Sequence, residues 1–234
     1  MAKRPVFAVS EEKGSLFIEE EIEFEWFSGF AASQKQKSIK SLHESAKNSG
    51  YDEILEVSTK SEKKLGNYLS AFNLSFPMQD GSLVFLESAF QGSKKFENGG
   101  PYNDLYFMKP FDVKKDERIS KDNIITGFVF EGVEWDSEPK TAFYDWLYIN
   151  AVNKNIQQND EAYQKILEYD AFTDIEFNPK KSINCQARSC ALYVSLFKQN
   201  LLSTALESKK NFLDIILSSN SYQLEPKIEK LFPL

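Results

Sequence analysis

Two short polar and aromatic segments, joined by a turn, constrain the middle of the chain more than any other feature. The segments are 69–73 (LSAFN) and 87–94 (ESAFQGSK), and the turn signal Asp80-Gly81 lies between them. If the second segment is helical, Glu87, Gln91 and Lys94 occupy positions i, i+4 and i+7 and share one face. A face of acid, amide and amine beside aromatic rings is unusual for a core-facing helix. It predicts a pocket for a small polar ligand.

Length and composition are those of an ordinary globular protein. The chain has 234 residues, of which 41% are hydrophobic and 27% are charged, which fits one domain, or one domain with an elaborated N-terminus. No long apolar stretch follows the basic residues near the N-terminus, and no run of 18 apolar residues occurs anywhere. We therefore expect no signal peptide, no membrane span and a cytoplasmic location.

The net charge argues against a protein that binds nucleic acid by bulk electrostatics. The formal charge is −7 and the pI is about 5.0, so bare duplex DNA would repel the chain at long range. Any contact with DNA must therefore be local. Four small basic clusters occur: Lys35 to Lys40, Lys94-Lys95, Lys114-Lys115 and Lys180-Lys181. Of these, Lys94-Lys95 and Lys180-Lys181 lie inside the segments that resemble a pocket.

The scarcity of histidine and cysteine excludes several kinds of site. The single histidine, His43, lies in a Lys- and Ser-rich helical pattern, and we expect it to be solvated. Cys185 and Cys190 are expected to be free, buried thiols. Three such residues cannot supply a structural zinc site of the usual type, whereas carboxylate-bound magnesium is left open. The chain also lacks the glycine-rich phosphate-binding motifs.

Periodicity predicts an α+β fold: a predominantly helical single domain with a small β element. Residues 1–22 are expected to be extended or loosely packed, and residues 101–122 to form a long irregular connection. Strands are predicted at 19–25, 54–57 and 124–130, and helices at 34–47, 141–152, 163–169, 187–198 and 202–217. We divide the chain into an N-terminal extension with a strand and a charged helix (1–57), a main domain (58–217) and a C-terminal tail (218–234).

The ordered motifs resemble the NADAR superfamily, whose members hydrolyse N-glycosidic bonds. The family pattern reads roughly Leu-Ser-x-Phe, then Asp-Gly, then Glu-x-x-x-Gln-x-x-Lys, and all three pieces occur here in order. Family-like blocks follow at 135–146 and at 175–179, with Asn184 and Arg188 after them. Three further segments, 34–43, 96–102 and 177–188, resemble the branch of antitoxins paired with DarT-type DNA ADP-ribosyltransferase toxins. No single motif is diagnostic, but the ordered set is fairly specific.

The resemblance implies a NADAR-like fold and assigns roles to named residues. Glu87 is the first candidate for the carboxylate that stabilises the oxocarbenium-like transition state or activates water. The second acid is Asp174 or Glu176, because the spacing around Asn178-Pro179 differs from the wider family. Lys94, with Lys60 as a rival, either pairs with a pyrophosphate or acts as an amine nucleophile. The remaining candidates bind substrate: Ser70, Phe72, Asn73, Gln91, Trp135, Asn184 and Arg188.

The activity implied by the resemblance is an ADP-ribosyl glycohydrolase. It would cleave the bond between ADP-ribose and guanine bases in DNA, release free ADP-ribose and act as the antitoxin of a DarT-type toxin, without a cofactor, a metal or a membrane. Direct binding of the toxin is left open. The alternatives are an N-glycosidase acting on intermediates of riboflavin biosynthesis, and a non-catalytic module that binds ADP-ribose or the toxin.

Overall fold

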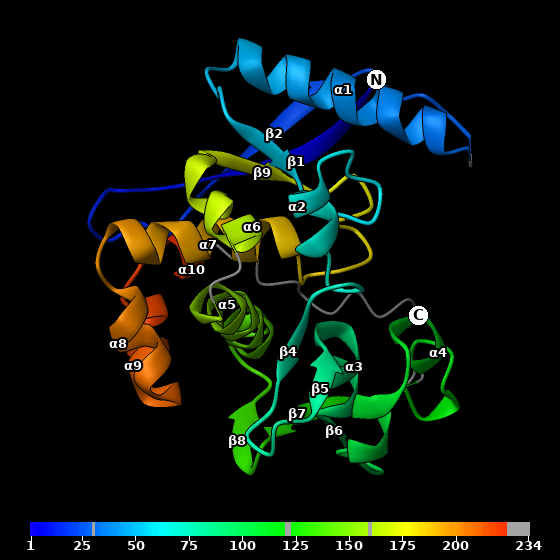
Figure 1. Cartoon of the computed structure of the whole chain (residues 1–234), viewed down its shortest axis with the longest axis vertical. Coiled ribbons are helices and arrows are strands. Elements are labelled where there is room, and N and C mark those ends of the chain that lie inside the picture. The colour runs from blue at the N-terminus through cyan, green and yellow to red at the C-terminus, as the bar shows by residue number, and fades with distance from the viewer. Residues whose placement is uncertain (30, 120–122, 159–160, 224–234) are drawn as a thin grey trace, which may run out of the picture.

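Two largely buried helices lie at the centre of the molecule (Figure 1). The computed structural model describes residues 1–29, 31–119, 123–158 and 161–223. Helix α5 (Ala142–Gln157) and helix α7 (Gln186–Lys198) are buried on nearly all sides along most of their length, because other elements enclose them. Both were predicted from their helical periodicity, and the prediction is confirmed, although α5 extends beyond its predicted end.

A four-stranded sheet packs above these helices, in the order β2-β1-β9-β3. Strands β2 (Ile18–Phe24) and β1 (Ala2–Ala8) are antiparallel, β9 (Ala171–Thr173) is antiparallel to β1, and β3 (Ile54–Glu56) is parallel to β9. Helix α1 (Ala32–Asn48) covers the outer face and α7 the inner face. The first 57 residues therefore share one sheet with a strand from the second half of the chain.

The start of the chain is a strand, so of the two expectations, extended or loosely packed, the extended one is confirmed. Val6 and Ala8 point toward α1, whereas Phe7 lies in the central core. Both faces of β1 are therefore buried. Helix α1 buries the predicted stripe of Ile39, Leu42 and Ala46.

The lower half of the molecule carries the two-part motif. Asp80-Gly81 forms the turn of a hairpin between β4 (Ser75–Pro77) and β5 (Leu83–Phe85), with Asp80 Oδ1 accepting hydrogen bonds from the Ser82 backbone amide and hydroxyl at 2.8 and 2.6 Å. Helix α3 (Leu86–Gly92) follows directly. Strands β6 (Lys94–Phe96), β7 (Ile125–Phe130) and β8 (Val133–Asp136) form a second antiparallel sheet.

The remaining elements are short. The predicted irregular connection contains the 3-10 helices η1 (Asn103–Phe107) and η2 (Glu117–Ile119) and the one-turn helix α4 (Pro110–Val113), and its residues 120–122 lie outside the described part. The other elements are α2 (Lys64–Tyr68), α6 (Glu161–Gln164), η3 (Lys165–Glu168), α8 (Leu202–Glu207), α9 (Lys209–Leu217) and α10 (Asn220–Gln223). The single helix predicted over 202–217 is two helices, because Ser208 is extended and its hydroxyl caps α9.

The fold is a single α+β domain with 44% helix and 19% strand in three small sheets. The α+β class is confirmed, but the β part is larger than the small element we predicted. The start of the C-terminal tail is anchored, since the Tyr222 hydroxyl donates a hydrogen bond of 2.8 Å to Asp145 Oδ2. Residues 224–234 lie outside the described part. No helix among the described residues is long and apolar enough to cross a membrane. Both cysteines are free and buried, as predicted.

Candidate functional site

A cleft of about 1160 Å³ lies between the sheet with α1 and the half that contains α3. Its lining comes from the segment after β3, the turn before β4, helix α3, strands β6 and β7, helix α4, and the connection between β9 and α7. Most of the predicted site residues line it: Lys60, Ser70, Phe72, Glu87, Gln91, Lys94, Asp174, Glu176 and Asn184. Segments more than 100 residues apart in the sequence thus meet around one hollow.

Glu87 sits on the first turn of α3 and is only 6% exposed. Gln91, one turn later, donates a hydrogen bond of 2.9 Å from Nε2 to Glu87 Oε1. The same oxygen lies 3.3 Å from Lys114 Nζ, which comes from the end of α4. A buried carboxylate is costly without such partners. The amide and the ammonium therefore hold Glu87 in one position at the cleft wall.

Lys94 reaches the cleft from a strand, which corrects the predicted three-residue helix face. Helix α3 ends at Gly92, and Lys94 opens β6. Its Nζ lies 5.1 Å from the centroid of the Phe90 ring. Burial lowers the pKa of Lys94 to about 8, with the charge of Lys114 acting in the same direction and that of Glu87 opposing it. Lys94 therefore populates both the ammonium and the amine near neutral pH.

Asp174 lies directly after β9, where it senses the charge of a second buried acid, Glu56. Burial and the neighbouring charge of Glu56 raise the pKa of Asp174 well above its ordinary value, against hydrogen bonds from the backbone amides of Glu176 and Phe177 and from the Gln186 side chain. Two carboxyl groups at close range cannot both ionise easily. Asp174 is therefore suited to carry a proton at neutral pH.

Glu56 is held by a network that sequence patterns did not reveal. It accepts hydrogen bonds from the Ser58 hydroxyl at 2.6 Å, the Thr173 hydroxyl at 2.7 Å and the Ile175 amide at 2.9 Å. His43 Nε2 lies 2.8 Å from Thr173 Oγ1. His43 is therefore not a solvated helix residue, as we expected, but part of the support behind Asp174.

Tyr144 on α5 also lines the cleft, and its functional position was not predicted. Burial raises the pKa of its hydroxyl, and so do the charges of Glu87, Cys185 and Asp174. The hydroxyl therefore keeps its proton and can donate a hydrogen bond. Tyr144 belongs to the family-like block at 135–146, in which only Trp135 was predicted to bind substrate.

Helix α1 contacts two residues of the cleft lining through its first turn. Lys35 Nζ lies 3.0 Å from Glu176 Oε1 and 4.9 Å from the centroid of the Trp26 ring. The Gln36 amide donates a hydrogen bond of 2.5 Å to the carbonyl oxygen of Lys60. The basic helix α1 thus contacts two of the segments that line the cleft and helps to hold them in place.

Two amides at the cleft present acceptor atoms. Gln91 Oε1 and Asn184 Oδ1 are buried and find no hydrogen-bond partner among the described residues. For Gln91 the orientation follows from its contact with Glu87, since only the NH₂ group can donate to a carboxylate. Unsatisfied buried acceptors are rare in folded proteins, so the hydroxyl groups of a ligand are their natural partners.

Three predicted site residues lie outside the lining. Asn73 is exposed and donates hydrogen bonds to the backbone and side-chain oxygens of Asn67. Trp135 packs in the core, with ring centroids 5.0 Å from Trp146 and 5.6 Å from Phe143. Arg188 is buried against Asp145, with its Nη2 2.8 Å from Asp145 Oδ2.

Potential metal ligands are not gathered at this cleft. In residues 1–29, 31–119, 123–158 and 161–223, no group of three or more His, Cys, Asp or Glu side chains is placed to hold a metal ion. The polar lining is instead dominated by lysines, amides and hydroxyl groups. Such a lining is suited to an anionic ligand rich in hydroxyl groups.

Comparison with known proteins agrees with this picture. A search of curated proteins finds no significant match. The family model described as the DarT1-associated NADAR antitoxin matches residues 2–226. The match includes the first strand, helix α1 and the anchored start of the tail, as well as every predicted site residue. The chain therefore belongs to the DarT1-associated NADAR antitoxin family.

Proposed function

We propose that this protein is an ADP-ribosyl glycohydrolase that cleaves the N-glycosidic bond between ADP-ribose and guanine bases in DNA. The main support for the proposal is that a buried carboxylate, Glu87, lies in a cleft lined by lysines, amides and hydroxyl groups. Such groups can bind phosphates and ribose hydroxyl groups. ADP-ribose combines two phosphates with two ribose rings. Its bond to a base breaks through a transition state with positive charge at the anomeric carbon.

The two acidic residues suit opposite tasks in this reaction. We assign to the Glu87 carboxylate the stabilisation of charge on the anomeric carbon or the activation of water. We assign to Asp174, whose pKa is raised, the delivery of a proton to the departing exocyclic amine of guanine. Acid–base pairs in enzymes are commonly built from groups whose environments differ in this way.

The cleft also offers groups that can bind the part of the substrate that does not react. Gln91 Oε1 and Asn184 Oδ1 can accept hydrogen bonds from ribose hydroxyl groups. Lys94 or Lys60 can pair with the pyrophosphate, and Phe72 can stack on the adenine ring. The binding energy of these contacts with the riboses, the pyrophosphate and the adenine would orient the scissile bond.

The biological role follows from the family. We infer that the protein reverses the modification made by a DarT-type toxin and thereby acts as its antitoxin. The family description names association with DarT1, and removal of the product explains protection without a stable complex between the two proteins. The overall charge of −7 is compatible with a substrate attached to DNA if the enzyme binds mainly the ADP-ribose group.

The proposal is tested by incubating the purified protein with an oligonucleotide that carries one ADP-ribosylated guanine. We expect release of free ADP-ribose and recovery of the unmodified oligonucleotide, measured by chromatography and mass spectrometry. Glu87→Ala should abolish release but still bind ADP-ribose, and Glu97→Ala, an exposed control, should behave like the wild type. Binding of ADP-ribose without turnover by the wild type would instead indicate a non-catalytic module, and turnover of riboflavin intermediates alone would indicate the other glycosidase.

A further inference from the structure

The cleft is larger than a single small ligand requires. Pockets for such ligands typically measure about 300–1,000 Å³, and this cleft measures about 1160 Å³. Its inner wall carries the buried groups Glu87, Gln91 and Asp174, whereas its outer lining includes exposed residues from α4 and from the connection between β9 and α7. In Figure 1 these two segments lie on the same side of the molecule, in its right half. The outer part is therefore open to a second portion of the substrate.

An exposed aromatic ring stands at this outer part. Phe111 on α4 is 64% exposed although it lines the cleft. Lys115 Nζ lies 3.9 Å from the centroid of its ring, and Lys114 Nζ lies 4.5 Å from that of Phe72. Each ring thus carries an ammonium group close to one face. This combination of ring and cation is the usual platform for an unpaired base and its phosphate.

The lining is also the place where this acidic protein concentrates cations. Six lysines contribute to it: Lys60, Lys94, Lys114, Lys140, Lys180 and Lys181. Two of its four acidic residues are already paired, Glu87 with Lys114 and Glu176 with Lys35. Lys180 and Lys181 are exposed on the outer connection. Lysines thus outnumber acidic residues in the lining of a protein whose net charge is −7, which favours an anionic ligand that extends to this outer part.

We propose that Phe111, Lys180 and Lys181 form a subsite for the single-stranded nucleic acid that flanks the modified guanine. Phe111 stacks on a neighbouring base, and the lysines pair with backbone phosphates. A duplex cannot use the ring in this way, because the faces of its bases are covered by stacking. The inference rests on the proposed glycohydrolase function, but it concerns the DNA strand and not the ADP-ribose.

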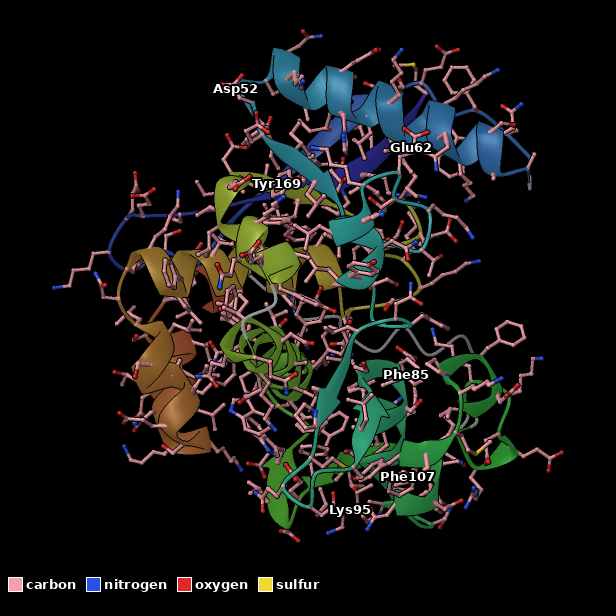
Figure 2. The ribbon with its side chains drawn as sticks, in the orientation of Figure 1. Asp52, Glu62, Phe85, Lys95, Phe107 and Tyr169 are labelled. Atoms are coloured by element: carbon pink, nitrogen blue, oxygen red, sulfur yellow. The ribbon has the colours of Figure 1, made fainter. Side chains whose placement is uncertain are left out.

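The test compares two substrates: a guanine-ADP-ribosylated oligonucleotide and the corresponding ADP-ribosylated guanosine without flanking nucleotides. Phe111→Ala should lower kcat/KM about tenfold for the oligonucleotide alone. Phe107→Ala is the matched control, because Phe107 is 65% exposed, lies outside the lining and is seen in the lower part of Figure 2. Equal losses for both substrates, or no loss for either, would overturn the subsite.

The lysines are tested by salt dependence. The double variant Lys180→Gln/Lys181→Gln should reduce the slope of log Kd against log salt for a single strand by about 1.4, which is roughly 0.7 for each lost phosphate contact. The control Lys37→Gln/Lys40→Gln removes two charges on α1, away from the cleft lining, and should leave the slope unchanged. An unchanged slope in the first variant would contradict the assignment.

Failure of the proposed function is distinguishable from failure of the subsite. If the wild type cleaves neither substrate, binding of unmodified single-stranded and duplex oligonucleotides is measured by fluorescence anisotropy. Preference for the single strand, weakened by Phe111→Ala, would support the subsite without the activity. Equal or tighter binding of the duplex, or no binding at all, would overturn it.

Discussion

Lys114 Nζ lies 3.3 Å from Glu87 Oε1, although the two residues belong to different elements and no motif links them. The ammonium also lies over the Phe72 ring, so one side chain connects the Glu87 carboxylate with the aromatic ring of Phe72. We infer that Lys114 compensates the charge of Glu87 before the substrate brings its own positive charge into the transition state.

Lys114→Met should therefore lower kcat for the ADP-ribosylated guanosine substrate about tenfold, equivalent to roughly 1.4 kcal/mol of transition-state stabilisation. Lys115→Met is the neighbouring control, since Lys115 does not line the cleft and its partner ring, Phe111, is assigned to flanking nucleotides that this substrate lacks. Steady-state kinetics of both variants provide the measurement. Equal activities of the two variants would show that the ion pair has no part in turnover.

Lys94 should make ligand binding depend on pH in a defined direction. Its pKa is lowered to about 8, so the ammonium that attracts a pyrophosphate disappears as the pH rises through 8. We expect the affinity for ADP-ribose to fall above that pH in the wild type and to stay level in Lys94→Arg, because a guanidinium keeps its charge. Isothermal titration calorimetry at pH values from about 6.5 to 9.5, which bracket this pKa, measures the effect.

The control for Lys94 is its neighbour Lys95. Lys95 lies at the lower edge of the molecule in Figure 2 and pairs with Glu134 at 3.9 Å, so Lys95→Met should leave the pH profile intact. The nucleophilic role of Lys94 makes a different prediction: borohydride added during turnover would trap a covalent adduct on this residue. An adduct found by mass spectrometry would replace the electrostatic role with the covalent one.

Arg188 is expected to matter for stability more than for binding. Its guanidinium contacts Asp145, which is 0% exposed, and Arg188→Met would leave that carboxylate with fewer partners in the core. The expected loss is about 3–5 kcal/mol in the free energy of unfolding, measured by urea denaturation. Arg118→Met, which removes exposed pairs with Asp104 and Asp116, should cost much less. If the Arg188→Met variant is stable but no longer binds ADP-ribose, the result would support the predicted role of Arg188 as a ligand contact.

His43 should destabilise the fold in acid. Burial lowers its pKa to about 4 from an ordinary value of 6.5, so the unfolded chain binds the proton first and stability falls as the pH drops from 6.5 to 4. The loss is roughly 3 kcal/mol. Glu56 acts in the opposite sense, because its pKa is raised to about 7 and the folded state keeps its proton longer. The difference between wild type and His43→Gln isolates the histidine, and parallel stability curves would contradict the assignment.

The sequence predicted the elements whose patterns are local. Helices α5 and α7 and strand β7 have long apolar or β-branched runs, and each was found near its predicted position. The start of the chain was predicted only as extended or loosely packed, and its pairing with two other strands was not predicted. It contains Pro5, a residue usually confined to the edges of sheets. In the structure β9 pairs only with Phe7 and Ala8, so at Pro5 the strand has β2 as its neighbour and no ladder bond to β9 is needed.

The site was predictable as far as it follows the chain. Glu87 and Gln91 are one helical turn apart, and their contact follows from that spacing. The contacts of Lys114 with Glu87 and of Glu56 with Ile175 join segments that are distant in sequence. They depend on how α4 and β9 pack, and no local pattern encodes that packing.

We assign Glu87 to the chemical step rather than to binding. The single-turnover rate of ADP-ribose release by Glu87→Gln, measured together with the Kd of the same variant for ADP-ribose, tests this assignment. We predict a rate about 10²–10⁴-fold below that of the wild type and a Kd within a few-fold of it. Release at the wild-type rate would contradict the catalytic role of Glu87, and so would a rate restored in full by saturating substrate.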